Sequence, residues 1–326
     1  MKKLVENFGQ QLNEAIAIGE KAILTPSSKP IHNVLISGLG GSGISGTLVA
    51  ELMEQTSVVP ICVNKKYHLA KFVNENTLFI ASSYSGNTEE TVEALEAAIK
   101  ARAKIVCVSS GGKVIELAKQ HGLDHIILPG GMPPRACLGY SFTQLLYVLA
   151  FNKVIPSNYS NELKATIDLL NTYKDSIQAE ALETAKFLLN KTTVIYTMSF
   201  EAVAIRFRQQ INENSKELCW HHIVPEMNHN ELVGWRNKNE NMAVVILENN
   251  EDYFRNKKRM EVCEQIISQY TSHVKRIISK GNSDLERAMY HIHLTDWVSC
   301  YIADLKGIDA TEVNVINHLK GELSKI

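Results

Sequence analysis

Hydroxyl side chains gather in one short stretch of this 326-residue chain, just ahead of a segment with helical spacing. Residues 78–81 are apolar, and Ser83, Ser85 and Thr88 follow them. A strand that delivers hydroxyls to a helix N-terminus forms an anion site, because the first N–H groups of a helix have no partner within it. The stretch contains no lysine, so we interpret it as a binding site for a small phosphorylated molecule and not as a nucleotide P-loop.

A glycine-rich turn at residues 38–46 precedes this stretch. Glycines let a backbone approach a ligand and expose its N–H groups, which makes Gly41 and Ser42 candidates for phosphate binding. The turn also satisfies the GxGxxG pattern of a dinucleotide site. Such a site needs an acidic residue after the second strand, where this chain has Asn64, Lys65 and Lys66. A tight turn without a ligand is the other alternative.

Four further side chains could act on a substrate. Arg135 follows two prolines that stiffen its loop, and a guanidinium group suits an oxyanion. Glu213 lies in a polar segment at the end of a predicted helix, and His229 lies in a loop among amides and carboxylates. Taken singly, Glu213, His229 and the C-terminal Lys320 would more often be solvated or structural side chains.

Metal binding deserves a check because the chain has eleven histidines. They cluster at 221–222, at 291–293 and around 229–231. None of these clusters has the HExxH or Cys/His spacing of a metal site, so the sequence predicts no metal.

Composition excludes several classes of protein. A formal net charge of −1 argues against a general nucleic-acid-binding protein, which needs a basic face. No apolar run is long enough to span a membrane, and the N-terminus does not resemble a signal peptide. Six cysteines without a CxxC pair suggest buried, reduced thiols. We therefore expect a cytoplasmic protein without membrane or nucleic-acid partners.

The elements that must position these residues alternate between strands and helices in the first half. The predicted strands cover 34–37, 58–63, 77–81, 104–109 and 125–128. The predicted helices cover 44–53, 88–101, with Asn87 as its cap, 113–121 and 141–151. This rhythm, with β-branched strands, indicates an α/β fold in which helices cover both faces of a parallel sheet.

The rhythm restarts in the second half, after helices predicted at 163–173 and 179–189. Strands are predicted at 193–197, 242–247 and 274–278, and helices at 200–212, 253–270 and 283–305. The shared order of elements suggests a weak internal repeat. We place the domain boundary in the polar segment 156–162, which predicts one domain over 1–155 and a second over 156–326.

Five motifs, taken together and in this order, resemble the bifunctional phosphoglucose/phosphomannose isomerases of the tandem sugar-isomerase-domain superfamily. The motifs are Gly-Leu-Gly-Gly-Ser-Gly-Ile-Ser-Gly at 38–46, Ser-Tyr-Ser-Gly-Asn-Thr-Glu-Glu-Thr at 83–91, Pro-Pro-Arg at 133–135, Asn-Glu-Asn-Ser-Lys at 212–216, and Pro-Glu-Met-Asn-His-Asn-Glu at 225–231. The resemblance runs from about residue 30 to the C-terminus. It implies two tandem sugar-isomerase-type αβα sandwich domains with parallel sheets flanked by helices.

The resemblance also implies a role for each candidate residue. The residues that match the holders of the sugar phosphate are Gly41, Ser42, Ser83, Ser85 and Thr88. Arg135 matches the arginine that stabilises an enediolate, and Glu213 matches the base that moves a proton between adjacent carbons. His229 matches a ring-opening histidine donated by the neighbouring subunit of a homodimer, and Lys320 matches a lysine that assists ring opening.

The implied reaction interconverts glucose 6-phosphate, and mannose 6-phosphate, with fructose 6-phosphate through a cis-enediol. It needs neither a metal nor a redox cofactor, since a carboxylate can accept and return the same proton. Thr311 is the nearest match to a threonine that makes room for the mannose epimer. Two alternatives are a non-catalytic regulator that binds sugar phosphates and an amino-sugar phosphate isomerase. The first should lack the Glu213, His229 and Lys320 set.

Overall fold

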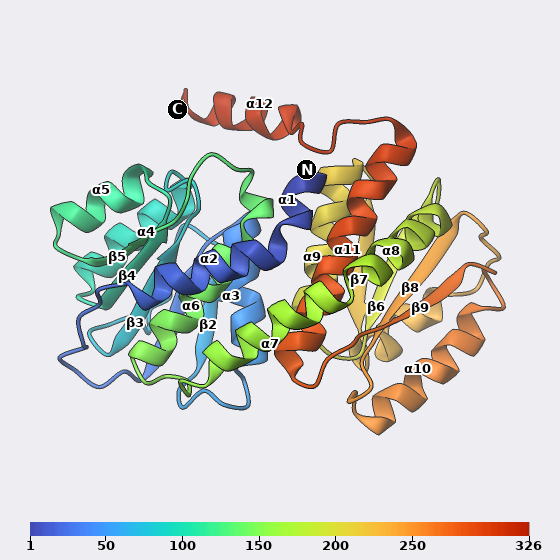
Figure 1. Ribbon diagram of the computed structural model, residues 1–326, viewed down its shortest axis with the longest axis horizontal. Helices are drawn as coiled ribbons and strands as arrows, with labels where there is room; N and C mark the ends of the chain where they lie inside the picture. The colour runs from blue at the N-terminus through green and yellow to red at the C-terminus, as the bar shows by residue number, and fades with distance from the viewer. Residues whose placement is uncertain (326) are drawn as a thin grey trace. The chain divides into compact units, whose positions relative to one another are not determined.

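Every strand of the computed structural model, which describes residues 1–325, belongs to one of two parallel sheets (Figure 1). The first sheet has the strand order β2-β1-β3-β4-β5, and the second has the order β7-β6-β8-β9. The first sheet contains β1 (Asn33–Ser37), β2 (Ile61–Asn64), β3 (Thr77–Ser82), β4 (Lys104–Ser109) and β5 (Asp124–Ile127). The second contains β6 (Thr192–Thr197), β7 (Cys219–Ile223), β8 (Met242–Glu248) and β9 (Val274–Ile278). This arrangement confirms the predicted α/β fold with two parallel sheets, one in each half of the chain.

The equivalent strand orders also confirm the internal repeat. β1 and β6 each lie second from one edge, with β2 or β7 on the outside and β3 or β8 on the inside. All six residues of β3 are buried, as expected for a central strand that is covered on both faces.

The contacts of the chain group it into two compact units, which we describe separately. The N-terminal unit comprises Glu6–Thr172 and Asn282–Glu286, and the C-terminal unit comprises Met1–Val5, Tyr173–Gly281 and the chain from Arg287 onward. The predicted boundary after residue 155 differs from this division at helix α7 (Tyr159–Thr172), which packs against α2 (Phe8–Glu20), and at the short segments Met1–Val5 and Asn282–Glu286.

Helices cover both faces of the first sheet. One face carries Leu35, Phe79 and Ile105, which pack against α4 (Glu89–Lys100) and α5 (Gly112–Gln120). On the other face α3 (Gly40–Leu52) packs against α6 (Leu138–Phe151), and α2 packs on α6 in turn. Figure 1 shows α4 and α5 side by side on the far side of these strands from α6 and α2.

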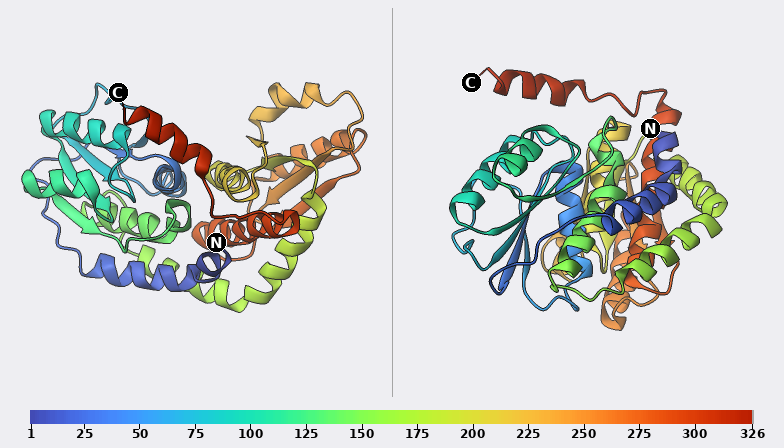
Figure 2. Two further views of the ribbon diagram at one scale, coloured as in Figure 1. Left: turned by 90° about the horizontal axis from the view of Figure 1, so that it is seen from above. Right: turned by 60° about the vertical axis from the view of Figure 1, so that its left-hand side comes forward.

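The second sheet is covered in the same way. α10 (Phe254–Ile267) and the turns η3 (Glu226–His229) and η4 (Glu231–Gly234) pack over one face, where they bury Tyr196, Val244 and Ile246. α9 (Glu201–Gln210) lies against β6 and β7 and is joined to α11 (Asp284–Lys306) by a buried ion pair between Arg206 and Asp296. The remaining helices are α1 (Lys2–Glu6), α8 (Lys174–Leu188) and α12 (Asn314–Leu323), and Figure 2 shows them from two further directions.

Several predicted details were wrong. The predicted helix 44–53 begins earlier, at Gly40, so Gly41 and Ser42 lie in the first turn of α3 and not in a preceding loop. The residue that caps α4 is Thr88, whereas the Asn87 side chain accepts a hydrogen bond from Lys113 N at the start of α5. The prediction also missed α1, α2, β7 and α12.

Candidate functional site

The glycine-rich turn and the hydroxyl stretch lie side by side, because they follow the neighbouring strands β1 and β3. A Cβ atom on Gly38 would lie 2.5 Å from the carbonyl oxygen of Ser82, so only glycine allows this approach. Ser42 is buried and its Oγ accepts a hydrogen bond from the backbone N of Tyr84 at 3.0 Å. These contacts connect two of the predicted phosphate-binding segments directly.

Within the hydroxyl stretch, Ser83 is the organising side chain. Its Oγ donates to Thr88 Oγ1 at 3.0 Å and accepts from Gly86 N at 3.2 Å. Gly86 has a φ of 73°, and a Cβ there would meet the carbonyl oxygen of Gly111 at 1.8 Å. Ser85 is exposed and accepts a hydrogen bond from Asn87 N, so its hydroxyl faces outward at the mouth of this turn.

Arg135 lies in the short turn η1 (Pro134–Ala136) and is 5% exposed. The turn approaches the start of α3 so closely that a Cβ on Gly41 would lie 2.7 Å from the Pro134 carbonyl oxygen and 3.2 Å from Arg135 Cα. The structure therefore places Arg135 beside Gly41 and Ser42. Five of the six candidates of this unit are joined by these contacts, and Ser85 lies in the same turn as Ser83 and Thr88.

In the C-terminal unit, Glu213 lies on η2 (Ile211–Ser215), a single π-helical turn that continues α9. π-helical turns are rare and occur often at functional sites. The neighbours of Glu213 fix this turn on α11: Asn214 Nδ2 donates to Ser299 Oγ, and Ser215 Oγ donates to the Ser299 carbonyl oxygen, each at 2.9 Å. Glu213 itself is partly buried and directly precedes these two fully buried anchors.

Lys216 connects this turn to the C-terminal segment. Its Nζ donates to the carbonyl oxygen of Glu213 at 2.5 Å and to that of Glu312 at 2.6 Å. Thr311, the residue before Glu312, is exposed. Lys216 is a positioning contact that the sequence analysis missed, and its place within the Asn-Glu-Asn-Ser-Lys motif was the available signal.

His229 lies on η3 and is exposed, although the turn that carries it is firmly anchored. Met227, two residues earlier, is fully buried. Glu231, two residues later, accepts hydrogen bonds from the Tyr196 hydroxyl at 2.5 Å and from Trp220 Nε1 at 3.0 Å. The histidine is therefore held on a fixed turn with its side chain open to solvent.

Lys320 lies on α12, and no residue of this helix is buried. Val315 and Leu319 are 83% and 58% exposed and lie one turn apart on one face of α12. Lys320 is next to that face and is exposed, as expected for a solvated charge.

The second sheet has a different set of side chains at the carboxyl ends of its strands. The loop after β8, which matches the hydroxyl stretch after β3 in sheet order, contains Asp252. Asp252 accepts hydrogen bonds from Ser199 Oγ and from Asn249 N, and the second of these is 2.6 Å long. Burial raises the pKa of Asp252, and the two hydrogen bonds oppose that shift. A buried carboxylate of the chain thus satisfies the donors of this edge.

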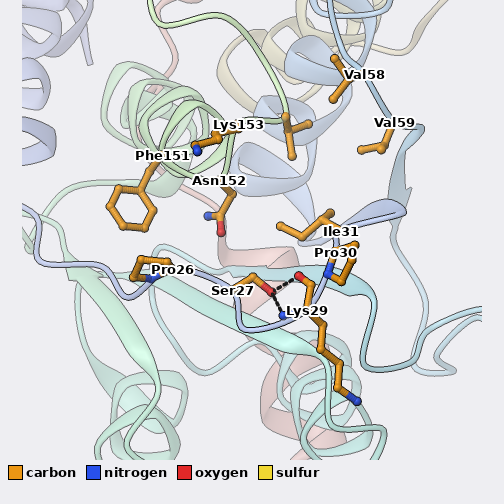
Figure 3. A pocket seen from close by; sticks show the side chains of 11 residues that line it. Pro26, Ser27, Lys29, Pro30, Ile31, Val58, Val59, Phe151, Asn152 and Lys153 are labelled. Atoms are coloured by element: carbon orange, nitrogen blue, oxygen red, sulfur yellow. Dashed lines mark hydrogen bonds between the residues drawn. The ribbon is translucent and has the colours of Figure 1, made fainter.

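The structure places other features apart from these groups. A cavity of about 270 Å³ is lined by residues such as Ile31, Val59 and Asn152 (Figure 3). It lies at the amino-terminal ends of the strands of the first sheet, because Ile31 and Val59 precede β1 and β2. The hydroxyl stretch lies at the carboxyl ends of these strands, since it follows β3. Within residues 1–325, no group of three or more His, Cys, Asp or Glu side chains could hold a metal ion. None of the helices in that range is long and apolar enough to cross a membrane.

Comparison with known protein families gives one match in each half of the chain. A SIS-domain family model matches residues 29–142, and the model of the bacterial phospho-glucose isomerase C-terminal SIS domain matches residues 177–323. A bifunctional phosphoglucose/phosphomannose isomerase of Caldicellulosiruptor bescii is 38% identical and covers 100% of this chain and 99% of its own length. A protein of the same name from Aquifex aeolicus is 33% identical over 99% of this chain and 98% of its own.

The fold also matches solved structures. The C-terminal domain of glucosamine-fructose-6-phosphate aminotransferase from Francisella tularensis superposes with a TM-score of 0.73. The match covers 96% of this chain and 97% of that one at 16% sequence identity. At this identity the likeness supports the fold alone.

Proposed function

Because this chain belongs to the bifunctional phosphoglucose/phosphomannose isomerases, we propose that it interconverts glucose 6-phosphate and mannose 6-phosphate with fructose 6-phosphate. The observation that carries the proposal is the meeting of Ser42, Ser83 and Thr88 at one sheet edge, with buried Arg135 beside Gly41. Hydroxyls and a nearby guanidinium suit a substrate whose phosphate is held while another part of it reacts.

The phosphate is bound by the hydroxyl stretch and by the first turn of α3. Ser42, Ser83, Ser85 and Thr88 supply hydroxyl donors, and Gly41 supplies a backbone N–H group in the first turn of α3, where no partner within the helix is available. The N-termini of α3 and α4 begin within or directly after these segments, and both favour an anion.

Ring opening comes first, because glucose 6-phosphate is a closed hemiacetal whose carbonyl carbon must be freed. His229 and Lys320 move the protons of this step: one proton leaves the anomeric hydroxyl and one is delivered to the ring oxygen as its bond to C1 breaks. His229 comes from the neighbouring subunit of a homodimer. Its exposure on a well-anchored turn supports that assignment, since the imidazole is open to a second chain.

Isomerisation then moves one proton between the two carbons and a second between their oxygens. Glu213 accepts the proton from C2 of the open aldose and returns it to C1, while the proton of the C2 hydroxyl passes to the C1 oxygen. The intermediate is a cis-enediol, and Arg135 donates hydrogen bonds to its developing oxyanion. The anchoring of the Glu213 turn by Asn214 and Ser215 supports a base that must hold one position.

Mannose 6-phosphate forms when the same enediol is protonated at C2 on its other face. Thr311 sets the room for that epimer. This assignment is supported by the place of Thr311 beside Glu312, because Lys216 Nζ donates to the carbonyl oxygens of both Glu312 and Glu213. In this scheme the first half of the chain, 1–155, binds the phosphate, and 156–326 supplies the base. Proton transfers alone suffice, so the scheme uses no metal or redox cofactor.

A coupled assay tests the proposal. Purified protein is given fructose 6-phosphate, and glucose 6-phosphate and mannose 6-phosphate are measured separately. Protein carrying Glu213→Gln, prepared in parallel, controls for contaminating isomerases. Turnover to both products is expected. Binding of fructose 6-phosphate without turnover would indicate a regulator instead, and the isomerase proposal would be wrong.

A further inference from the structure

Tyr84 lies in the middle of the hydroxyl stretch, yet it is only 6% exposed. Its backbone N donates to Ser42 Oγ at 3.0 Å. Its carbonyl oxygen accepts from Ser110 twice, from the backbone N at 2.9 Å and from Oγ at 2.6 Å. The backbone of Tyr84 is therefore fixed by the segments that follow β1 and β4.

The side chain of Tyr84 reaches a third segment. Its hydroxyl donates to the carbonyl oxygen of Pro129 at 2.7 Å and accepts from Met132 N at 3.3 Å. A hydroxyl can do both at once, since it has one hydrogen and two lone pairs. Burial raises the pKa of Tyr84, so the phenol remains protonated and keeps its donor at physiological pH. These two bonds close the turn in which Gly131 has a φ of 86°.

The turn leads straight to Arg135 through two prolines. Pro133 and Pro134 restrict the backbone, because each ring fixes φ near −65°. The position of Met132 is thereby transmitted to Arg135 with little freedom between them. At the other end, Pro134 rests against Gly41. Gln11 Nε2 also donates to the carbonyl oxygen of Ala136 at 2.8 Å, so several contacts hold the Arg135 segment, and those of the Tyr84 hydroxyl fix the part that precedes the two prolines.

We infer that Tyr84 is a positioning residue for Arg135: its hydroxyl fixes the turn at residues 129–132 so that the guanidinium is held where the enediolate forms. This inference rests on the proposed function. The Tyr84 hydroxyl donates one hydrogen bond and accepts another, both within the protein. Its effect therefore passes through Arg135 and not through contact with substrate.

Tyr140 provides a matched control. It is 4% exposed, lies in the same unit on α6, and its hydroxyl donates to Glu14. Neither Tyr140 nor Glu14 belongs to the substrate-binding segments. Tyr140→Phe therefore removes one buried phenol hydroxyl, as Tyr84→Phe does, without touching the Arg135 turn.

The kinetic test compares both variants in the fructose 6-phosphate assay. Tyr84→Phe should lower kcat by about 10- to 100-fold, since misplacement by about 1 Å costs roughly that much. The Kd for inorganic phosphate should stay within about twofold, because Ser83 and Thr88 keep their bonds. Tyr140→Phe should change neither value. An unchanged kcat for Tyr84→Phe, or an equal loss in both variants, would overturn the inference.

A double-mutant cycle separates positioning from a general structural role. In an Arg135→Lys background the guanidinium fork is already lost, so adding Tyr84→Phe should lower kcat by less than about twofold. If the two losses multiply fully, Tyr84 does not act through Arg135.

Hydrogen exchange supplies a readout that is independent of turnover. The Met132 amide should exchange at least about tenfold faster in Tyr84→Phe than in wild type or Tyr140→Phe, because its acceptor is gone. Unchanged protection would contradict the clamp itself. Absence of turnover in the wild-type protein would instead refute the proposed function, so the two failures are distinguishable.

Discussion

Gly41→Ala tests the contact between α3 and the Arg135 turn. The added Cβ would lie 2.7 Å from the Pro134 carbonyl oxygen, whereas ordinary contact begins at 3.4 Å. The atoms in the way belong to the backbone of Pro134 and to Arg135 Cα, so no flexible side chain can yield instead. The Arg135 turn must therefore retreat by about 0.7 Å.

The magnitude follows from that displacement. A shift of about 1 Å in a catalytic group costs about 100-fold in rate, so 0.7 Å corresponds to about 25-fold in kcat, or about 1.9 kcal/mol of activation free energy. The free energy of unfolding should fall by much less than this change in activation free energy. Gly41 lies within a helix at a negative φ, where alanine is favoured over glycine by about 0.5–1 kcal/mol.

The assay measures kcat for fructose 6-phosphate together with the midpoint of urea unfolding. Gly9→Ala is the matched control, because Gly9 is also the second residue of its helix, α2, and its Cβ would meet nothing closer than 3.5 Å. We expect normal kcat for Gly9→Ala and about 25-fold loss for Gly41→Ala. Full activity of a stable Gly41→Ala protein would refute the reasoning, since the turn would then have moved without consequence.

Three further predictions concern other parts of the chain. Glu213→Gln should abolish turnover while fructose 6-phosphate still raises the melting temperature, and loss of that thermal shift would assign Glu213 a structural role. Mixed dimers of His229→Ala and Glu213→Gln chains should regain activity at one of two sites, whereas verified heterodimers without activity would place the histidine within its own chain. Burial lowers the pKa of His291 to about 4, so the folded state keeps this imidazole neutral while the unfolded state binds a proton below about pH 6.5. Stability should therefore fall by about 1.6 kcal/mol from this group as pH drops from 6.5 to 5, and His291→Gln should remove that part of the loss in urea titrations at the two pH values; equal losses in both proteins would contradict it.

Much of the fold could be predicted because its signals are local. β1, β3, β4, β6 and β8 are continuous apolar runs, and a strand buried on both faces needs no other pattern. The candidate residues of the N-terminal unit were likewise found in segments that follow such strands, where parallel topology brings loops together.

Other elements depend on contacts that no local pattern contains. β7 reads Cys-Trp-His-His-Ile, which lacks an apolar run, and it forms because β6 pairs with it. Asn87 is a good capping residue by type, yet its side chain bonds Lys113 in the next helix. Tyr84 looks like an aromatic residue misplaced among hydroxyls until the turn at 129–132 is seen beside it.

Asp252 has a consequence for which loops of this protein a phosphate can stabilise. In the proposed function the hydroxyl stretch binds a phosphate, and a phosphate at a hundredfold its Kd would add about 2.7 kcal/mol to the free energy of unfolding. The matching loop after β8 already has its anion in the Asp252 carboxylate, bonded to Ser199 and Asn249. That loop has its anion in the covalent chain, so the hydrogen-exchange protection of the Asn249 amide should be insensitive to phosphate concentration. In the proposed function, one loop of the repeat takes its anion from solution, whereas the matching loop has its anion as part of the chain.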